Sequence, residues 1–462
     1  TITQEDSTAA NAAAHQKDSA EHDESEAPLI KPISSSSIKR LVAGQAITDL
    51  SSSVKELVDN AIDAGATRIS IKLYNQGLEC IELIDNGNGV LKSSRPYMAQ
   101  RHATSKLRQL EDIYTGACAP TLGFRGEALF CLANLSRSLK VSTRTVEDES
   151  LGESFCFDTQ GELIADSIVP TPRSVGTTVS VIGLMESLPV RRVDMCKRIK
   201  AQNMKLMKLL QGYAILCMGV QFTFTDVATT TAAKNKKTVV RLATSDSSKT
   251  MEARVASVLG TKYLAGLTRI ELDLQSAVND NNNDSVEAEK NHGNHMEKWS
   301  MSGLISHSPT SPNPGNARDM QFFSINGRPV DLPSVSRVIG DVWRTFDPSI
   351  EGSGGGSKRS GRRPACVLAF TLPASMYDVN LAPDKREVMF TEETLIIGCI
   401  RDGLMKVWSE QSEGKFRANE VEKRSAVAKA ANPVAKLSVT QEPSTQNEEH
   451  SSRAEESVVC DD

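Results

Sequence analysis

Three polar side chains share one face of a short helical pattern near the start of the sequence. Glu56, Asn60 and Asp63 follow the spacing i, i+4, i+7, opposite an apolar stripe. The carboxamide oxygen of Asn60 suits Mg²⁺, which prefers oxygen ligands and keeps several waters. The Glu56 carboxylate can take a proton from an attacking water. The pattern therefore predicts a site for water-mediated phosphate cleavage.

Glu56 also has a purely structural interpretation. Ser53 precedes it by three residues, and Ser-x-x-Glu is the pattern of a helix capping box. In that case the Glu56 carboxylate binds the backbone at the helix start and has no chemical role. Taken alone, the helix favours this interpretation, so other segments must decide between the two.

A glycine-containing loop, Asp85–Val90 (DNGNGV), follows a pattern typical of a buried strand. Asp85 can accept a hydrogen bond from the exocyclic amine of a purine. Gly87 and Gly89 lack a Cβ atom, so a flat base can approach their backbone. Thr177 brings a hydroxyl, on another predicted strand, that can support the base. Asn-Gly turns are also common in hairpins, so the loop alone is not decisive.

Two further segments carry groups that bind phosphate. Residues 101–106 (RHATSK) supply two hydroxyls and a cation, and residues 123–129 (GFRGEAL) open a predicted helix directly after a glycine. Backbone N–H groups exposed at a helix N-terminus bind anions. The segment from about residue 92 to residue 122 is polar and weakly patterned, as expected of a lid over bound phosphates.

Apolar periodicity predicts the elements that hold these side chains. Residues 54–62 repeat apolar side chains at i, i+3, i+4, i+7, i+8, with Ser53 as the expected cap and Gly65 as the expected end. Further helices are predicted at about 125–135, 193–218 and 392–411, and strands at 68–73, 80–84, 139–144, 177–182, 321–325 and 366–372. We therefore expect an α+β fold in two packed domains.

Composition indicates that these domains occupy only part of the 462 residues. Hydrophobic residues make up 39% of the chain, below the roughly 45–50% of compact domains. We predict a disordered acidic extension over 1–36 and a disordered tail or linker over 412–462. The first domain is expected over 37–230. The second is expected over 231–411, with insertions near 279–298 and 351–363.

Charge, hydropathy and cysteine usage exclude several classes of protein. The 53 Lys+Arg and 58 Asp+Glu residues give a net charge of −5, which excludes a wholly basic nucleic-acid coat but permits a local basic groove. No apolar run approaches the roughly 20 residues that span a bilayer, so no membrane partner is expected. The nine cysteines contain no CxxC pair and are typical of reduced intracellular thiols.

The order of the motifs resembles the MutL mismatch-repair proteins, within the GHKL ATPase superfamily. The matching motifs are KELVDNAIDAGA (55–66), DNGNGV (85–90), RHATSK (101–106), GFRGEAL (123–129), GTTVSV (176–181), LPVRR (188–192), FFSINGRPV (322–330) and DVNLAPDKREV (378–388). The opening IKPI (30–33), LPVRR and PDKR are most similar to the eukaryotic post-meiotic-segregation type. The resemblance implies a GHKL (Bergerat) ATPase α/β sandwich followed by a ribosomal-protein-like α/β domain.

The resemblance also implies roles for individual residues. Glu56 would be the general base and Asn60 the Mg²⁺ ligand. Lys385, in the second domain, would reach the γ-phosphate, where a compact ammonium neutralises developing charge. Arg328 matches a family position linked to DNA contact. The adenine-binding set would be Asp85, Gly89 and Thr177, and the phosphate-binding set Thr104, Ser105, Lys106, Gly123, Phe124, Arg125, Gly126, Glu127, Ala128 and Leu129.

For function, the resemblance implies a nuclear, ATP-driven clamp with ATP and Mg²⁺ as cofactors. It implies a MutL-homologue partner subunit, a MutS-type mismatch-recognition complex, and non-specific, salt-sensitive binding of double-stranded DNA. A catalytically inactive scaffold subunit is one alternative. Another GHKL ATPase, such as a topoisomerase ATPase subunit, is a second, although RHATSK and GFRGEAL argue against it. DNA cleavage is not assigned, because no run resembles the family's DQHAxxE nuclease motif.

Overall fold

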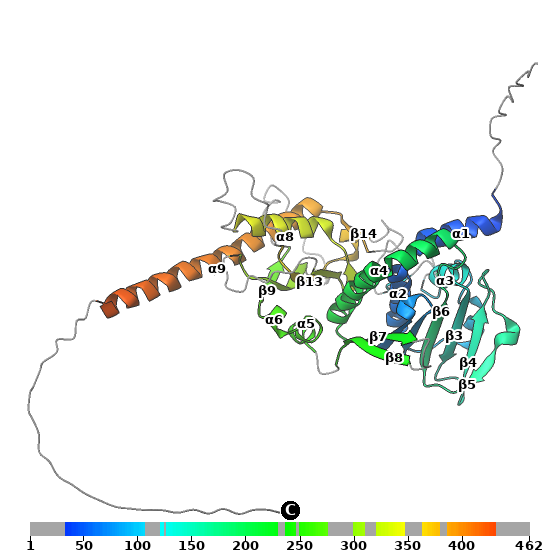
Figure 1. Ribbon diagram of the computed structural model, residues 1–462. Helices are drawn as coiled ribbons and strands as arrows, with labels where there is room; N and C mark the ends of the chain where they lie inside the picture. Colours follow the sequence, from blue (N-terminus) through cyan, green and yellow to red (C-terminus); the bar gives the residue numbers. More distant parts are fainter. Residues whose placement is uncertain are drawn as a thin grey trace, which may run out of the picture.

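The computed structural model describes residues 33–106, 121–123, 126–229, 236–245, 249–275, 299–309, 320–346, 363–378 and 386–430. In these ranges the chain builds one sheet of eight strands, one of five and a two-stranded hairpin, and helices pack against both larger sheets (Figure 1). This arrangement confirms the expected α+β fold.

The first sheet has the strand order β5-β4-β3-β6-β2-β1-β7-β8. All its neighbours pair antiparallel except β1 and β7, which pair parallel. The strands are β1 Arg68–Tyr74, β2 Cys80–Asp85, β3 Ser138–Arg144, β4 Gly152–Phe157, β5 Val169–Thr171, β6 Gly176–Ile182, β7 Gln221–Thr229 and β8 Lys236–Ala243.

Four α-helices pack on one face of this sheet (Figure 1). They are α1 Ser35–Ala46, α2 Leu50–Asp63, α3 Ala128–Leu135 and α4 Pro189–Leu216. Alternate residues of β1 and β2 point into the shared core, as the period of two in a strand requires. Short 3₁₀ turns lie at η1 Asn75–Gly77, η2 Lys92–Tyr97 and η4 Ala165–Ser167.

The start of α2 differs from the predicted cap. Asp49 is the N-cap, and its carboxylate accepts a hydrogen bond of 2.8 Å from the Ser52 backbone, while the Asp49 backbone donates to the Ser52 hydroxyl. This capping box lies one turn before Ser53, which is inside the helix. Gly65, with φ of +74°, follows the helix end as predicted.

The second sheet has the order β12-β11-β13-β10-β9, and its core contains the buried rings of Trp343 and Trp408. Its strands are β9 Leu267–Asp273, β10 Ser300–Ser306, β11 Gln321–Ile325, β12 Arg328–Val330 and β13 Cys366–Thr371. The helices are α5 Met251–Leu259, α6 Thr261–Leu264, α8 Pro333–Thr345 and α9 Glu393–Ala430, with η6 Ala374–Met376 and a small hairpin of β14 Tyr377–Asp378 and β15 Met389–Phe390.

Two predicted segment boundaries require correction. Helix α1 begins at Ser35, inside the extension predicted to end at residue 36, because Ser34 caps it. Helix α9 continues through residues 412–430, which we assigned to the tail. These residues are rich in Ala, Glu, Lys and Arg, which favour helix without any apolar period. The predicted insertions near 279–298 and 351–363 lie outside the described residues, apart from Arg363.

The C-terminal end of α4 joins the two parts of the molecule. Ile215 and Leu216 share a buried apolar cluster with Phe322 of β11. The buried guanidinium of Arg254, on α5, donates hydrogen bonds to the carbonyl oxygens of Met218 at 2.7 Å and Val220 at 2.9 Å. The positive charge of Arg254 therefore meets the negative end of the α4 dipole.

We predict that Arg254→Ala lowers the free energy of unfolding by about 3 kcal/mol, because buried carbonyls lose a charged donor. Urea denaturation followed by circular dichroism measures the change. Arg269→Ala is the matched control, since that side chain is largely exposed and lies 3.8 Å from Glu252. We expect the control to change stability by less than about 0.5 kcal/mol. Equal effects of the two substitutions would contradict the role of Arg254.

Candidate nucleotide-binding site

Three segments that are distant in the sequence converge on the carboxylate of Asp63, at the end of α2. Its Oδ1 accepts a hydrogen bond of 2.7 Å from the Leu122 backbone, and its Oδ2 accepts one of 2.9 Å from the Gly123 backbone. The Lys106 ammonium lies 2.5 Å from the same Oδ2. The end of the RHATSK motif and the start of the GFRGEAL motif therefore meet at the polar face of α2.

Lys106 places a positive charge beside the atom predicted to bind Mg²⁺. Its Nζ lies 3.1 Å from Asn60 Oδ1. An amide oxygen and a carboxylate oxygen thus already hold one cation, the Lys106 ammonium. Oxygen atoms of these kinds are the ligands that Mg²⁺ prefers. Among the described residues there is no cluster of three or more His, Cys, Asp or Glu side chains suited to a metal. The remaining ligands of a Mg²⁺ ion here would come from phosphate and water.

Glu56 lies on the same face of α2, one turn before Asn60. Its side chain is 13% exposed, and its Oε1 lies 3.3 Å from the Lys55 ammonium. The capping box of α2 is formed by Asp49 and Ser52, so the capping interpretation of Glu56 is wrong. The carboxylate of Glu56 pairs with Lys55, and the capping role at the helix start belongs to Asp49 and Ser52.

Asp85, the residue predicted to hold the base, lies at the end of β2. Its Oδ1 accepts hydrogen bonds from the backbones of Gly87 at 2.8 Å and Thr177 at 3.1 Å. Burial raises the pKa of Asp85 above its usual value of 3.8, although these two hydrogen bonds oppose the shift. Both of these hydrogen bonds use Oδ1. Asp85 and Thr177, which are both predicted to hold adenine, are thus adjacent.

The glycines of the DNGNGV loop are needed first for packing of the protein itself. A Cβ atom on Gly89, whose φ is +74°, would lie 2.2 Å from the Arg144 carbonyl oxygen. A Cβ atom on Gly87 would lie 2.8 Å from the Ala64 carbonyl oxygen. The approach of a base to these glycines stays a prediction, since the space of each missing Cβ atom is taken by neighbouring backbone of the protein.

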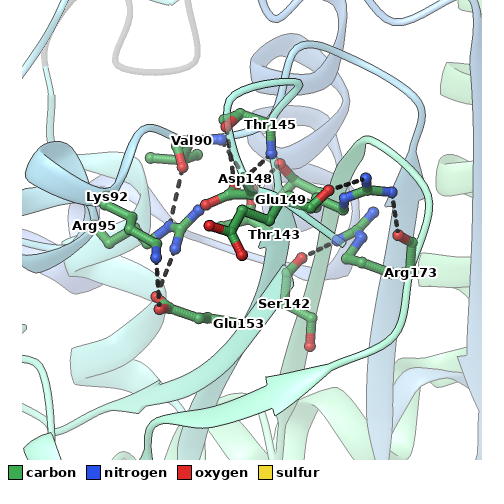
Figure 2. Close-up of polar contacts among 12 residues, drawn as sticks. Val90, Lys92, Arg95, Ser142, Thr143, Thr145, Asp148, Glu149, Glu153 and Arg173 are labelled. Carbon is green, nitrogen blue, oxygen red and sulfur yellow. Dashed lines mark hydrogen bonds and ion pairs between the residues drawn. The ribbon is translucent and has the colours of Figure 1, made fainter. Parts of the chain in front are cut away.

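An ionic cluster behind this loop was missed by the sequence analysis (Figure 2). The Val90 backbone donates to the Thr143 hydroxyl at 2.9 Å, and its carbonyl accepts from Arg95 Nε at 3.0 Å. The buried Arg95 guanidinium also pairs with Asp148 and Glu153, each at 2.5 Å. These carboxylates lie more than 50 residues from Arg95, so no local pattern pointed to them.

The described residues of the two predicted phosphate-binding segments, 101–106 and 123–129, lie close together. The Thr104 hydroxyl accepts from the Lys106 backbone at 3.2 Å, and Ser105 is exposed. A Cβ atom on Gly126 would lie 2.4 Å from the Ala103 carbonyl oxygen, so the two motifs are in direct contact. Helix α3 begins at Ala128 and includes Leu129, while Glu127 precedes it and pairs with Arg101. Phe124, Arg125 and Lys385 lie outside the described residues.

Arg328 lies between the two parts of the molecule instead of on a DNA-facing surface. It is 9% exposed, and its Nη2 donates to the Thr121 carbonyl oxygen. Its Nη1 is buried without a partner among the described residues. A guanidinium that binds DNA phosphates must face solvent, so this burial disagrees with the predicted DNA contact.

Comparison with known proteins gives two family matches. Residues 47–152 match the histidine kinase-, DNA gyrase B- and HSP90-like ATPase family, and residues 277–409 match the C-terminal domain family of DNA mismatch repair proteins. In the described ranges, no helix is both long and apolar enough to cross a membrane.

Individual relatives agree with these matches. The chain is 35% identical over 398 residues to the DNA mismatch repair protein PMS1 of Arabidopsis thaliana, which covers 86% of this chain and 38% of the relative. It is 32% identical over 380 residues to the human mismatch repair endonuclease PMS2, covering 82% of this chain and 40% of the relative. The chain thus spans about two fifths of the length of these curated relatives.

A solved structure extends the similarity to three dimensions. The crystal structure of the N-terminal domain of a DNA repair protein matches with a TM-score of 0.64 and 32% identity, over 81% of this chain and 98% of that chain. Together with the motifs and the site geometry, these matches show that the chain belongs to the MutL/PMS family of DNA mismatch-repair proteins, with a GHKL ATPase domain.

Proposed function

We propose that this chain is a Mg²⁺-dependent ATPase that works as a clamp in DNA mismatch repair. The observation that carries the proposal is the convergence of Asn60, Asp63 and Lys106 with the Gly123 backbone. This arrangement provides a cation position beside donors suited to phosphate. Asp85, at the other end of the site, supplies an acceptor for the adenine amine.

The residues have distinct roles in hydrolysis. Glu56 accepts the proton of the attacking water. Asn60 holds the metal, and bound Mg²⁺ would neutralise charge on the phosphates. Lys106 exchanges its contacts with Asn60 and Asp63 for contacts with phosphate oxygens. Lys385, from the second domain, neutralises charge on the γ-phosphate as it is transferred.

We infer a clamp because Lys385 belongs, by its position in the sequence, to the second of the two predicted domains. A γ-phosphate bound by Lys385 and by the first domain favours the arrangement in which both parts engage it. We propose that ATP binding in this way promotes association with a MutL-homologue partner in the nucleus. Double-stranded DNA is bound non-specifically through its phosphates, and a MutS-type complex directs the clamp to mismatches. These steps are supported by the family to which the chain belongs.

We predict that Asn60→Ala loses Mg²⁺-dependent nucleotide binding, with at least about a 100-fold rise in the Kd of MgATP, because the amide oxygen that holds the metal is removed. Equilibrium titration of a fluorescent ATP analogue, with Mg²⁺ or with EDTA, measures the Kd. The matched control is Asn203→Ala, since that amide donates to the Ile199 carbonyl oxygen on α4. A scaffold without catalysis would show the same background ATP turnover in wild type and in Asn60→Ala. That result would remove the enzyme proposal.

A further inference from the structure

A buried chain of polar groups connects helix α4 to the proposed general base. The Tyr213 hydroxyl donates a hydrogen bond of 2.5 Å to Asp59 Oδ1. The other carboxylate oxygen of Asp59 lies 2.7 Å from the Lys55 ammonium, which in turn lies 3.3 Å from Glu56 Oε1. The order is therefore Tyr213, Asp59, Lys55 and Glu56, with α4 contributing the first group and α2 the other three.

Burying these four linked polar groups costs free energy, so their positions relative to one another are constrained. Tyr213 and Asp59 are 2% exposed, and Lys55 is 4% exposed. A buried ammonium without a partner would be strongly destabilising, so Lys55 must remain between the two carboxylates. Burial lowers the pKa of Lys55, but the charges of Asp59 and Glu56 outweigh burial and hold it above 10.5. Lys55 is thus a fixed positive charge at neutral pH.

The hydroxyl of Tyr213 is a fixed donor for the same reason. Burial, followed by the negative charge of Asp59, raises the pKa of Tyr213 well above 10. The hydroxyl therefore keeps its proton and donates a hydrogen bond to Asp59. With one oxygen of Asp59 bound by Tyr213 and the other by Lys55, the position of the Lys55 ammonium is set from both sides.

Tyr213 also lies where α4 meets the second sheet. A Cβ atom on the preceding residue, Gly212, would lie 3.2 Å from the Phe322 ring of β11. Ile215, two residues after Tyr213, is in the buried cluster shared with β11. The positive charge of Arg386, the residue next to Lys385, lowers the pKa of Tyr213, although burial and the charge of Asp59 outweigh this effect. The packing of the second domain on α4 therefore bears directly on the first member of the chain.

We propose that Lys55, Asp59 and Tyr213 are positioning residues that hold the Glu56 carboxylate at the orientation required to accept a proton from water, with Tyr213 coupling that orientation to the second domain. This inference rests on the proposed ATPase function. It names residues of the same site to which the proposed function assigns no role. Its physical basis is that misplacing a reacting group by about 1 Å costs roughly 100-fold in rate.

The test is the kinetics of Tyr213→Phe in the full chain, which removes one hydroxyl and keeps the ring. We expect kcat for ATP to fall about 10-fold with the Kd of MgATP unchanged, because the carboxylate is misplaced only for the chemical step. The matched control is Tyr263→Phe, since the Tyr263 hydroxyl bonds a backbone carbonyl, that of Met320, at 3.3 Å. The control should keep the wild-type kcat. Single-turnover amplitudes report the fraction of active protein and should be equal in all variants.

A second variant separates positioning from a loss of stability. Lys55→Met keeps the side-chain length and removes the charge, and we expect kcat to fall about 100-fold. In the double variant Lys55→Met/Tyr213→Phe, the loss should be close to that of Lys55→Met alone, because both changes break one chain. If the two substitutions caused independent structural defects, their losses of kcat would instead multiply.

The outcomes distinguish this inference from the proposed function. If wild type and Glu56→Ala hydrolyse ATP equally, the proposed function fails. If Glu56→Ala is inactive while Tyr213→Phe and Tyr263→Phe both keep the wild-type kcat, the positioning role alone is overturned. An equal loss of kcat and MgATP affinity in Tyr213→Phe would also overturn it, since the linked polar groups would then affect nucleotide binding and not the chemical step alone.

Discussion

Glu56→Ala is expected to bind MgATP with the affinity of wild type while its turnover falls at least about 100-fold, the range for loss of a general base. The carboxylate lies on the polar face of α2, one turn before Asn60, the proposed metal ligand. Its contact with Lys55 is separate from the contacts that Lys106 makes with Asn60 and Asp63. Its removal therefore leaves the groups proposed to hold the nucleotide in place. Phosphate release measures turnover, and equilibrium titration measures the affinity.

Two further variants sharpen this prediction. Glu56→Gln keeps the shape of the side chain but cannot accept a proton at neutral pH, so it should be as inactive as Glu56→Ala. Glu82→Ala removes a carboxylate that pairs with Lys72 at 2.9 Å on the sheet, and it should keep wild-type turnover. Substantial hydrolysis by Glu56→Gln would show that another group takes the proton.

Asp85→Asn is expected to lose nucleotide affinity by at least about 100-fold, because a site built to pair a hydrogen-bond donor rejects the wrong partner strongly. Asparagine keeps the Oδ1 atom that accepts from Gly87 and Thr177. It replaces Oδ2 by an amide that donates, and this amide would face the donating amine of adenine. Competition of ATP against a fluorescent analogue measures the loss.

The same substitution is expected to stabilise the ligand-free protein at neutral pH. Burial raises the pKa of Asp85 above 3.8, so the folded protein disfavours the ionised form. The free energy of unfolding of wild type therefore falls as pH rises from 3.8 through the raised pKa, and asparagine removes this loss. The melting temperature of Asp85→Asn should exceed that of wild type at pH 7, and the difference should shrink toward pH 4. A variant that is less stable at pH 7, or that binds ATP normally, would contradict this account.

The elements that carry the candidate site could be predicted because they depend on local spacing. The polar face of α2 follows from helical periodicity, and the Asp85 loop follows from a strand pattern that gives way to Gly87 and Gly89. Periodicity did not identify the cap, because Asp49, Ser51, Ser52 and Ser53 are all suitable polar residues before the apolar stripe. Only the hydrogen bonds show that Asp49 and Ser52 form the capping box.

Features that depend on long-range contacts could not be predicted. Arg95 meets Asp148 and Glu153 across strands whose pairing the sequence does not specify. Arg328 was assigned by resemblance, yet its contact with Thr121 depends on how the two domains pack. The chain from Tyr213 to Glu56 needs both α2 and α4 in place, because Asp59 alone has no periodic signal that marks it as the link.

Helix α4 contributes side chains to two cores, and this limits how the protein can be divided for experiments. Leu206 and Leu210 belong to the core of the first sheet, whereas Ile215 and Leu216 belong to the cluster shared with β10, β11 and β13. A fragment ending after β8 would therefore carry a newly solvent-exposed apolar patch at the helix end. Such a truncation should aggregate more readily than the intact chain, and the smallest well-behaved recombinant unit must retain both sheets.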